Sequence, residues 1–207
     1  MIIVDCEQNT PEWMAARLGI PTASRFKDIV TPTGKLSKQS RGYQFELLAE
    51  WMTGHQKDGF ITDDMARGFL LQPEATAFYE MRAGVDVAEV GFCLEDGRRY
   101  GASPDGMPPG GDLEIKCCRQ NNHMEILLSG DMPPKHKPQV QGQLLVTVAE
   151  WCDFVAYHNE MPGIIIRVER DEPYINLLRS ALGEFCDGLE EAREKLIGRG
   201  FQPAIAA

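Results

Sequence analysis

Two carboxylates and one lysine stand at a spacing that suits the chemistry of phosphodiester hydrolysis. Asp105 follows a proline in the Gly- and Pro-rich stretch 96–112, whereas Glu114 and Lys116 lie in the predicted strand 112–118. Side chains alternate along a strand, so Glu114 and Lys116 share one face, with their Cα atoms about 6.5 Å apart. An aspartate in the preceding turn can meet that face. The spacing therefore predicts one site in which two carboxylates and an ammonium group converge.

These three side chains fit hydrolysis that is assisted by a metal ion. Two carboxylates supply the hard oxygen ligands that Mg²⁺ prefers, and Mn²⁺ takes ligands of the same kind. A bound metal ion polarises the phosphate and lowers the pKa of a bound water. Lys116 can stabilise the developing charge or orient the attacking water. The plainer alternative is a surface strand with a Glu–Lys pair that contributes little to stability.

Length and composition are typical of a soluble globular protein. The 207 residues, 43% of them hydrophobic, fit one domain over 1–207, with 172–207 as a C-terminal helical extension. No apolar run approaches the roughly 20 residues that cross a bilayer, and the N-terminus lacks the basic start of a signal peptide. We therefore expect a cytoplasmic protein with no membrane partner. The six cysteines contain no C-x-x-C pair, which favours buried thiols over a zinc site.

The net charge of −10 argues against a passive DNA-coating protein, because such proteins carry a basic face. It permits an enzyme whose carboxylates bind metal while a local basic track holds phosphates. Acidic residues crowd the predicted C-terminal helix. Basic residues gather elsewhere, at Arg17, Arg25, Lys27, Lys35, Lys38, Arg41, Lys116, Arg119, Lys135 and Lys137. This asymmetry predicts a basic DNA track with an acidic exterior, and scattered solvated faces are the alternative.

The predicted elements indicate a mixed α/β or α+β domain with helices on both faces of a central sheet. Helices are predicted at 10–18, 39–53, 62–82, 121–129, 136–148 and 172–197, with a further short one capped by Thr22 or Ser24. Strands are predicted at 85–94, near Tyr100, and at 112–118, 151–158 and 164–168. The last two would form a hairpin around Met161-Pro162-Gly163. A loop is predicted at 31–37.

Five short motifs occur in an order that is more specific than any one of them. They are W-x-x-x-R with T-A-S downstream (Trp13 to Ser24), R-G-x-x-x-x-P-E-A (Arg67 to Ala75), S-P-D-G (Ser103 to Gly106), L-E-I-K (Leu113 to Lys116) and Q-V-Q-G-Q-L (Gln139 to Leu144). Through them the chain resembles the PD-(D/E)XK nuclease superfamily. More narrowly, it resembles the lambda exonuclease or YqaJ-type viral recombinase family over roughly residues 8–160. This resemblance implies a restriction-endonuclease-like central mixed sheet flanked by helices.

The resemblance also implies roles for single residues. Asp105, Glu114 and Lys116 would form the catalytic centre, with Gln139 touching the lysine or the water network. Arg17 and Ser24 would bind the 5′-phosphate of a DNA end, since the arginine fork binds phosphate bidentately. Further residues expected near the DNA are Trp13, Ser103 and His136.

Plainer alternatives exist for several of these positions. Arg17 can be an exposed helix arginine, and Trp13 a core residue of an amphipathic helix. Gln139 can be a solvated helix residue. His136 can belong to a basic surface patch, since it lies between Lys135 and Lys137.

One position departs from the family pattern. Relatives commonly place a glutamate of the metal site just before the proline of the R-G-x-x-x-x-P segment, where this chain has Gln72. A neutral amide is a poorer ligand for a hard ion than a carboxylate. Either Gln72 ligates weakly through its carbonyl oxygen, or the site relies on Asp105, Glu114 and the backbone carbonyl of Ile115. An engineered substitution is a third possibility. The departure puts a second metal ion in doubt more than the first.

By resemblance, the leading interpretation is a Mg²⁺-dependent 5′→3′ exonuclease that acts on double-stranded DNA ends and leaves 3′ single strands for recombination. The same resemblance implies a ring-shaped homotrimer, a single-strand annealing protein as partner, and a phage or prophage origin in a bacterial host. Two alternatives remain open. One is a site- or structure-specific DNA endonuclease of the same fold. The other, motivated by Gln72, is a catalytically weakened protein that binds DNA ends.

Overall fold

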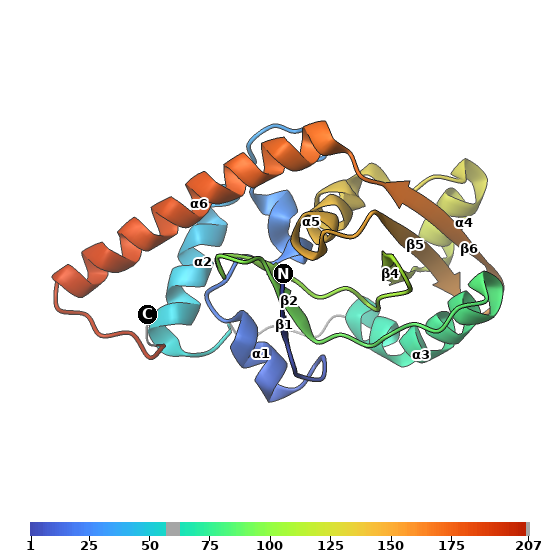
Figure 1. Ribbon diagram of the computed structural model, residues 1–207, viewed down its shortest axis with the longest axis horizontal. Coiled ribbons are helices and arrows are strands. Elements are labelled where there is room, and N and C mark those ends of the chain that lie inside the picture. Colours follow the sequence, from blue (N-terminus) through green and yellow to red (C-terminus); the bar gives the residue numbers. More distant parts are fainter. Residues whose placement is uncertain (57–62, 206–207) are drawn as a thin grey trace.

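The computed structural model describes residues 1–56 and 63–205 (Figure 1). Its strands are β1 Ile2–Val4, β2 Phe92–Leu94, β3 Gly101–Ala102, β4 Gly111–Cys117, β5 Trp151–His158 and β6 Met161–Glu169. Its helices are α1 Pro11–Arg17, η1 Ala23–Asp28, α2 Ser40–Thr53, α3 Asp63–Ala83, α4 Gln120–Ser129, η2 Pro134–His136, α5 Lys137–Thr147 and α6 Glu172–Gly198, where η marks a 3-10 helix. Within the described ranges, none of these helices is long and apolar enough to cross a membrane.

The strands form two three-stranded sheets. In the first, β1 pairs with β2 and β2 with β3, both antiparallel. In the second, β4 pairs with β5 in parallel and β5 with β6 antiparallel, which makes this sheet mixed. The predicted α+β class, with helices flanking a mixed sheet, is confirmed. The strands that were expected in one central sheet are divided between the two.

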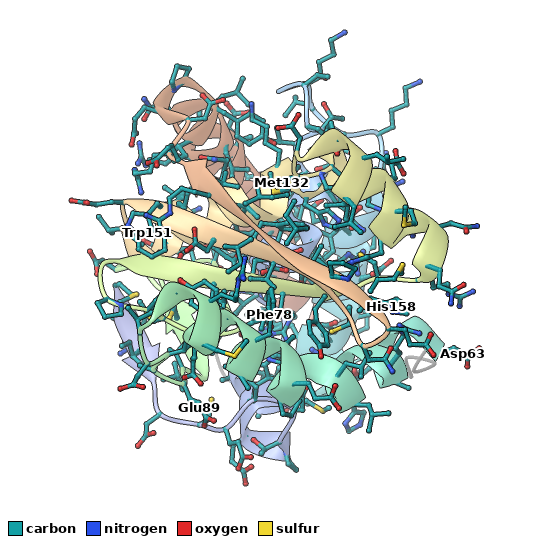
Figure 2. The ribbon with its side chains drawn as sticks, turned by 90° about the vertical axis from the view of Figure 1, so that its right-hand side faces the viewer. Asp63, Phe78, Glu89, Met132, Trp151 and His158 are labelled. Carbon is teal, nitrogen blue, oxygen red and sulfur yellow. The ribbon has the colours of Figure 1, made fainter. Side chains whose placement is uncertain are left out.

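Helix α3 covers one face of the mixed sheet. Leu113 and Ile115 of β4 are buried against this helix, in a cluster that includes Tyr79. Figure 2 shows Phe78 of α3 directed toward the strands, and its ring centroid lies 5.8 Å from that of Tyr157 on β5. Because side chains alternate along β4, the charged residues between these apolar positions face the other side of the sheet.

Helix α5 packs in the centre of the molecule, on that other side. Nine of its residues, Pro138 and 140–147, are buried. Gly142 approaches the Phe26 ring of η1 so closely that a Cβ atom would lie 2.4 Å from Phe26 Cδ2. Helix α6 runs from the end of β6 along α5 to α2 (Figure 1). The core therefore ties η1 and the C-terminal helix to the same central element.

Most predicted helices are found with shifts of a few residues at their ends. Thr10 caps α1 by accepting a hydrogen bond from the Trp13 N–H, as its position predicted. Thr22 precedes η1 but its side chain makes no capping bond. Position 62, the predicted start of the third helix, lies outside the described residues.

Two strand predictions were wrong in their extent. The strand predicted at 85–94 is continuous only over Phe92–Leu94. Ala88 forms an isolated antiparallel bridge with Met107, and Val85 and Val87 pack against the α3 cluster. The β5–β6 turn lies at residues 159–160 and not at 161–163, so that Pro162 lies inside β6. Proline is tolerated there because β6 is an edge strand and leaves one side of its backbone unpaired.

The close contact at Gly142 gives a test of the packing. Gly142→Ala is expected to destabilise the fold by about 1–3 kcal/mol, because the added methyl group would overlap the Phe26 ring. Gly183→Ala is the matched control: it lies inside α6, where an added Cβ would meet no neighbouring atom within 4 Å. Alanine there should stabilise the helix by up to about 1 kcal/mol. Thermal unfolding that shows the two variants equally stable would contradict the packing described here.

Candidate active site

Glu114, Lys116 and Gln139 form one contact group on the α5 side of β4. The Lys116 ammonium forms an ion pair with Glu114 Oε1, and Gln139 Nε2 donates a hydrogen bond of 2.7 Å to the same oxygen. The Glu114 side chain is only 1% exposed, whereas that of Lys116 is 29% exposed. Two donors therefore hold the buried Glu114 carboxylate in one orientation, next to the partly exposed side chain of Lys116.

Asp105 reaches the same place from the loop between β3 and β4. Its Oδ2 accepts a hydrogen bond of 2.6 Å from the Ile115 N–H, and its own N–H donates to the Leu113 carbonyl over 2.9 Å. From α3, Gln72 Nε2 donates to Asp105 Oδ1 over 3.4 Å. The loop is thus fastened to the strand that carries Glu114, which brings the predicted carboxylate pair together.

The charged side chains of this site influence one another's pKa. Burial, and after it the charge of Glu114, raises the pKa of Asp105 to about 7, against the lowering effect of Lys116. Burial lowers the pKa of Lys116, but the Glu114 and Asp105 carboxylates outweigh it and hold this pKa above its usual value. Lys116 therefore remains an ammonium ion. Above about pH 7, where Asp105 is ionised, two carboxylates with one ammonium leave a net negative charge that a bound cation would offset.

Few side-chain oxygen atoms near Asp105 and Glu114 could act as metal ligands. No group of three or more His, Cys, Asp or Glu side chains that could hold a metal ion occurs in residues 1–56 and 63–205. Gln72, at the position where the resemblance implies a glutamate, lies with its amide against Asp105. The side-chain donors at hand are therefore two carboxylates and one amide.

His136 lies beside the same group. Its ring centroid is 5.2 Å from that of Phe154 on β5. Burial lowers the pKa of His136 to about 3, and the charges of Lys116, Lys135 and Lys27 act in the same direction. The imidazole is therefore neutral, and three lysines lie close enough to influence it.

Trp13 connects the carboxylate loop with α1. Its Nε1 donates to Ser103 Oγ over 2.9 Å and to the Gly91 carbonyl over 3.2 Å. The Arg17 guanidinium carbon lies 3.7 Å from the centroid of the Trp13 ring. Because Ser103 precedes Asp105 by two residues, this contact fixes Arg17 relative to the carboxylates.

Arg17 and Ser24 line a pocket of about 460 Å³ between α1, η1 and α2. Burial lowers the pKa of Arg17 to about 10. Its buried Nε has no hydrogen-bond partner among the residues that the structure describes. A partly buried cation is costly on its own, and an oxyanion in the pocket would compensate its charge.

Sequence reasoning missed Glu50 and Arg193, which both bind the turn after Arg17. The Gly19 N–H donates to Glu50 Oε2 over 3.0 Å, and the Gly19 carbonyl accepts from Arg193 Nη2 over 2.7 Å. Gly19 has a φ of +68°, which favours glycine, and a glycine after a helix signals such a turn. No local pattern points to Arg193, because it lies 174 positions further along the chain.

Comparisons with known proteins agree with this fold. The sequence model of the YqaJ-like viral recombinase domain matches residues 12–150. Crystal structures of LHK-Exo, an alkaline exonuclease from Laribacter hongkongensis, one of them in complex with dAMP, are 36% identical in sequence. That similarity covers 92% of this chain and 98% of LHK-Exo, with a TM-score of 0.84. A phage-related exonuclease from Haemophilus somnus 129PT is 13% identical over 84% of this chain and 96% of its own, and its TM-score of 0.60 shows a shared fold alone. None of the curated proteins matches.

The fold and this carboxylate–lysine group define the class of protein: an enzyme that hydrolyses phosphodiester bonds in DNA, a nuclease. The chain belongs to the YqaJ-like viral recombinase family, whose model covers well over half of its length. The family predicted from the five motifs is thereby confirmed.

Asp112, two residues before Glu114, gives a test of burial at this strand. It is 0% exposed, its Oδ2 accepts a hydrogen bond of 2.7 Å from Thr147, and burial raises its pKa to about 7. The folded protein therefore keeps this proton to a higher pH than the unfolded chain, and stability falls as the pH rises toward 7. Asp112→Asn, which carries no charge, should raise the melting temperature by about 2–4 °C at pH 8 and by much less near pH 4, close to the pKa of 3.8 of an unperturbed aspartate. An equal effect at both pH values would contradict the raised pKa.

Proposed function

We propose that this chain is a Mg²⁺-dependent exonuclease that degrades one strand of linear double-stranded DNA from its 5′ end and leaves 3′ single-stranded overhangs. The convergence of Asp105, Glu114 and Lys116 beside the Arg17 pocket is the observation that carries the proposal. Exonuclease action on DNA as such follows from the family and from 36% identity to an alkaline exonuclease. The dAMP bound to that relative supports a site that accommodates one nucleotide.

The residues present fit one divalent cation. Asp105 and Glu114 would hold it through carboxylate oxygens, with the Ile115 carbonyl, the Gln72 amide oxygen and water as further ligands. Mg²⁺ is the ion we propose, and Mn²⁺ accepts the same ligands. Such an ion would polarise the phosphate and lower the pKa of a bound water. The excess negative charge of the two carboxylates over Lys116 is the feature of this chain that favours it.

The side chains around the carboxylates have separate tasks in this proposal. Lys116, kept charged by its two carboxylate neighbours, stabilises negative charge on the phosphate as the P–O bond breaks. Gln139 holds Glu114 in place through its 2.7 Å hydrogen bond and leaves the lysine free to turn toward substrate. Neutral His136 limits the positive charge beside Lys116 and presents a ring nitrogen to water or DNA.

The Arg17 pocket is proposed to bind the 5′-phosphate of the strand that is cut. Its buried, unsatisfied Nε and the Ser24 hydroxyl are donors suited to a phosphate monoester. Trp13 and Ser103 have a positioning role, because their hydrogen bond connects the helix that carries Arg17 with the loop that carries Asp105. Recognition of the terminal phosphate would place the first phosphodiester at the carboxylates and so set the 5′→3′ direction.

Three further features belong to the proposal on the strength of the family alone. They are a homotrimeric ring that encircles DNA, a single-strand annealing protein as partner, and a phage or prophage origin with a cytoplasmic location in a bacterial host. A nuclease that leaves 3′ overhangs would supply the substrate on which such an annealing protein acts.

Substitution of Glu114 tests the active site. With a 5′-phosphorylated linear duplex and Mg²⁺, Glu114→Gln should slow nucleotide release at least about 100-fold, because one metal-binding carboxylate is lost. Glu125→Gln on the exposed surface of α4 is the matched control and should leave the rate unchanged. Release that is independent of Mg²⁺, or unaffected by Glu114→Gln, would remove the proposed site from contention.

The same assay separates the alternatives. A covalently closed circular duplex should stay intact with the wild-type protein, whereas a site- or structure-specific endonuclease would cut it. A catalytically weakened end-binding protein would retain linear DNA without releasing nucleotides.

Substitution of Arg17 tests end recognition. Wild-type protein should degrade a 5′-phosphorylated duplex faster than the same duplex with a 5′-hydroxyl. Arg17→Ala should abolish this preference, a loss of about 10- to 100-fold in kcat/KM on the phosphorylated end, as expected when hydrogen bonds to a charged group are removed. The hydroxyl-ended duplex is the internal control and should be degraded at a similar rate by both proteins. An unchanged preference would show that the phosphate binds elsewhere.

A further inference from the structure

A second pocket lies between η1, the loop 31–39 and η2. It has a volume of about 550 Å³, and its lining includes Arg25, Lys27, Asp28, Gln39 and Lys135. Arg25 lines both this pocket and the pocket of Arg17, so the two hollows are neighbours. The hydrolytic mechanism proposed above uses none of the lysines at this pocket.

The lysines at this pocket differ from the others in the chain. The structure describes seven lysines, and three of them, Lys116, Lys137 and Lys195, lie within 4.0 Å of a carboxylate. The other four form no ion pair and no side-chain hydrogen bond with any residue in the described ranges. They are Lys27, Lys35, Lys38 and Lys135. All four lie in η1, in the loop after it or in η2, around the second pocket.

This grouping is notable in a chain with a net charge of −10, where carboxylates are abundant. Arg25 is an instructive contrast at the same pocket, because ion pairs with Asp28 and Glu46 already compensate its charge. Lys27 and Lys135 have no such ion pair within the described residues and are exposed. An uncompensated cluster of ammonium groups raises the local concentration of a polyanion.

The second pocket is also linked to the strand pair that carries Glu114. Its lining residue Lys135 precedes His136, whose ring centroid lies 5.2 Å from that of Phe154. Phe154 pairs with Glu114 in the register of β4 and β5. Through Arg25 on one side and Lys135 on the other, the second pocket neighbours both the pocket of Arg17 and the proposed active site.

We propose that Lys27 and Lys135 hold a backbone phosphodiester of the DNA duplex in this second pocket, inward of the bond that is cut. The inference rests on the proposed function. Flexible ammonium groups suit a contact that must recur at every nucleotide, because they bind phosphate as point charges without reading the base. The pocket would then keep hold of the duplex after each terminal nucleotide has left. The phosphodiester belongs either to the strand that is cut or to its complement.

The experiment compares Lys27→Ala/Lys135→Ala with wild-type protein on a 5′-phosphorylated linear duplex over a range of NaCl concentrations. The double variant should raise KM about tenfold at low salt and leave kcat unchanged. The dependence of log (kcat/KM) on log [NaCl] should become shallower by about 1, since one phosphate contact contributes about 0.9 to this slope. Lys195→Ala is the matched control, because that lysine is exposed on α6 and paired with Glu191.

Neutral methylphosphonate linkages then identify the strand. A single neutral linkage, moved stepwise inward from the end in either strand, should at one position weaken wild-type binding and have no effect on the double variant. That position, in the cut strand or in its complement, is the phosphodiester that the pocket holds. If no position in either strand behaves in this way, the proposal is overturned.

Failure of this inference can be told apart from failure of the proposed function. A wild-type protein that releases no nucleotides refutes the exonuclease proposal, whatever the lysines do. The pocket is then judged by fluorescence anisotropy of the same duplex without metal. A double variant that binds as tightly as wild type, with the same salt dependence, overturns the inference even if the enzyme is active.

Discussion

The structure depends on one short contact, the hydrogen bond from the Ile115 N–H to the Asp105 carboxylate. It fastens a Gly- and Pro-rich loop to a buried strand and brings two like charges together. Their mutual repulsion is offset because the Lys116 ammonium attracts both carboxylates, and because α3 and α5 pack against the strand from its two faces. The core around β4 thus keeps together two charges that would separate in a looser fold.

Sequence alone predicted the parts of this arrangement that depend on local periodicity. Alternation along β4 placed Glu114 opposite the apolar Leu113, and Pro104 with Gly106 marked the turn that carries Asp105. Sequence alone failed where a contact with a residue far away in the sequence determines the local structure. Val85 and Val87 have the composition of a strand, yet they pack against α3. Pro162 signals a turn, but on an edge strand its missing N–H removes no sheet hydrogen bond.

Gln72 stands where the family resemblance implies a glutamate, and its amide contacts Asp105. Its amide donates to Asp105, a bond that a carboxylate at this place could not supply without a proton or a cation between the two. The resemblance drew attention to the position, and the structure shows what the amide does there. With glutamine, the pair Asp105–Gln72 is satisfied by itself, so the carboxylates of this chain are organised before any cation arrives.

The bond between Arg193 and Gly19 has a consequence for biosynthesis. Arg17, Gly19 and Glu50 leave the ribosome early, whereas Arg193 follows 174 residues after Gly19. The turn after Arg17 therefore gains its second hydrogen-bond partner only when α6 has been translated and has packed against it. In a nascent chain without α6, Glu50 holds this turn without Arg193.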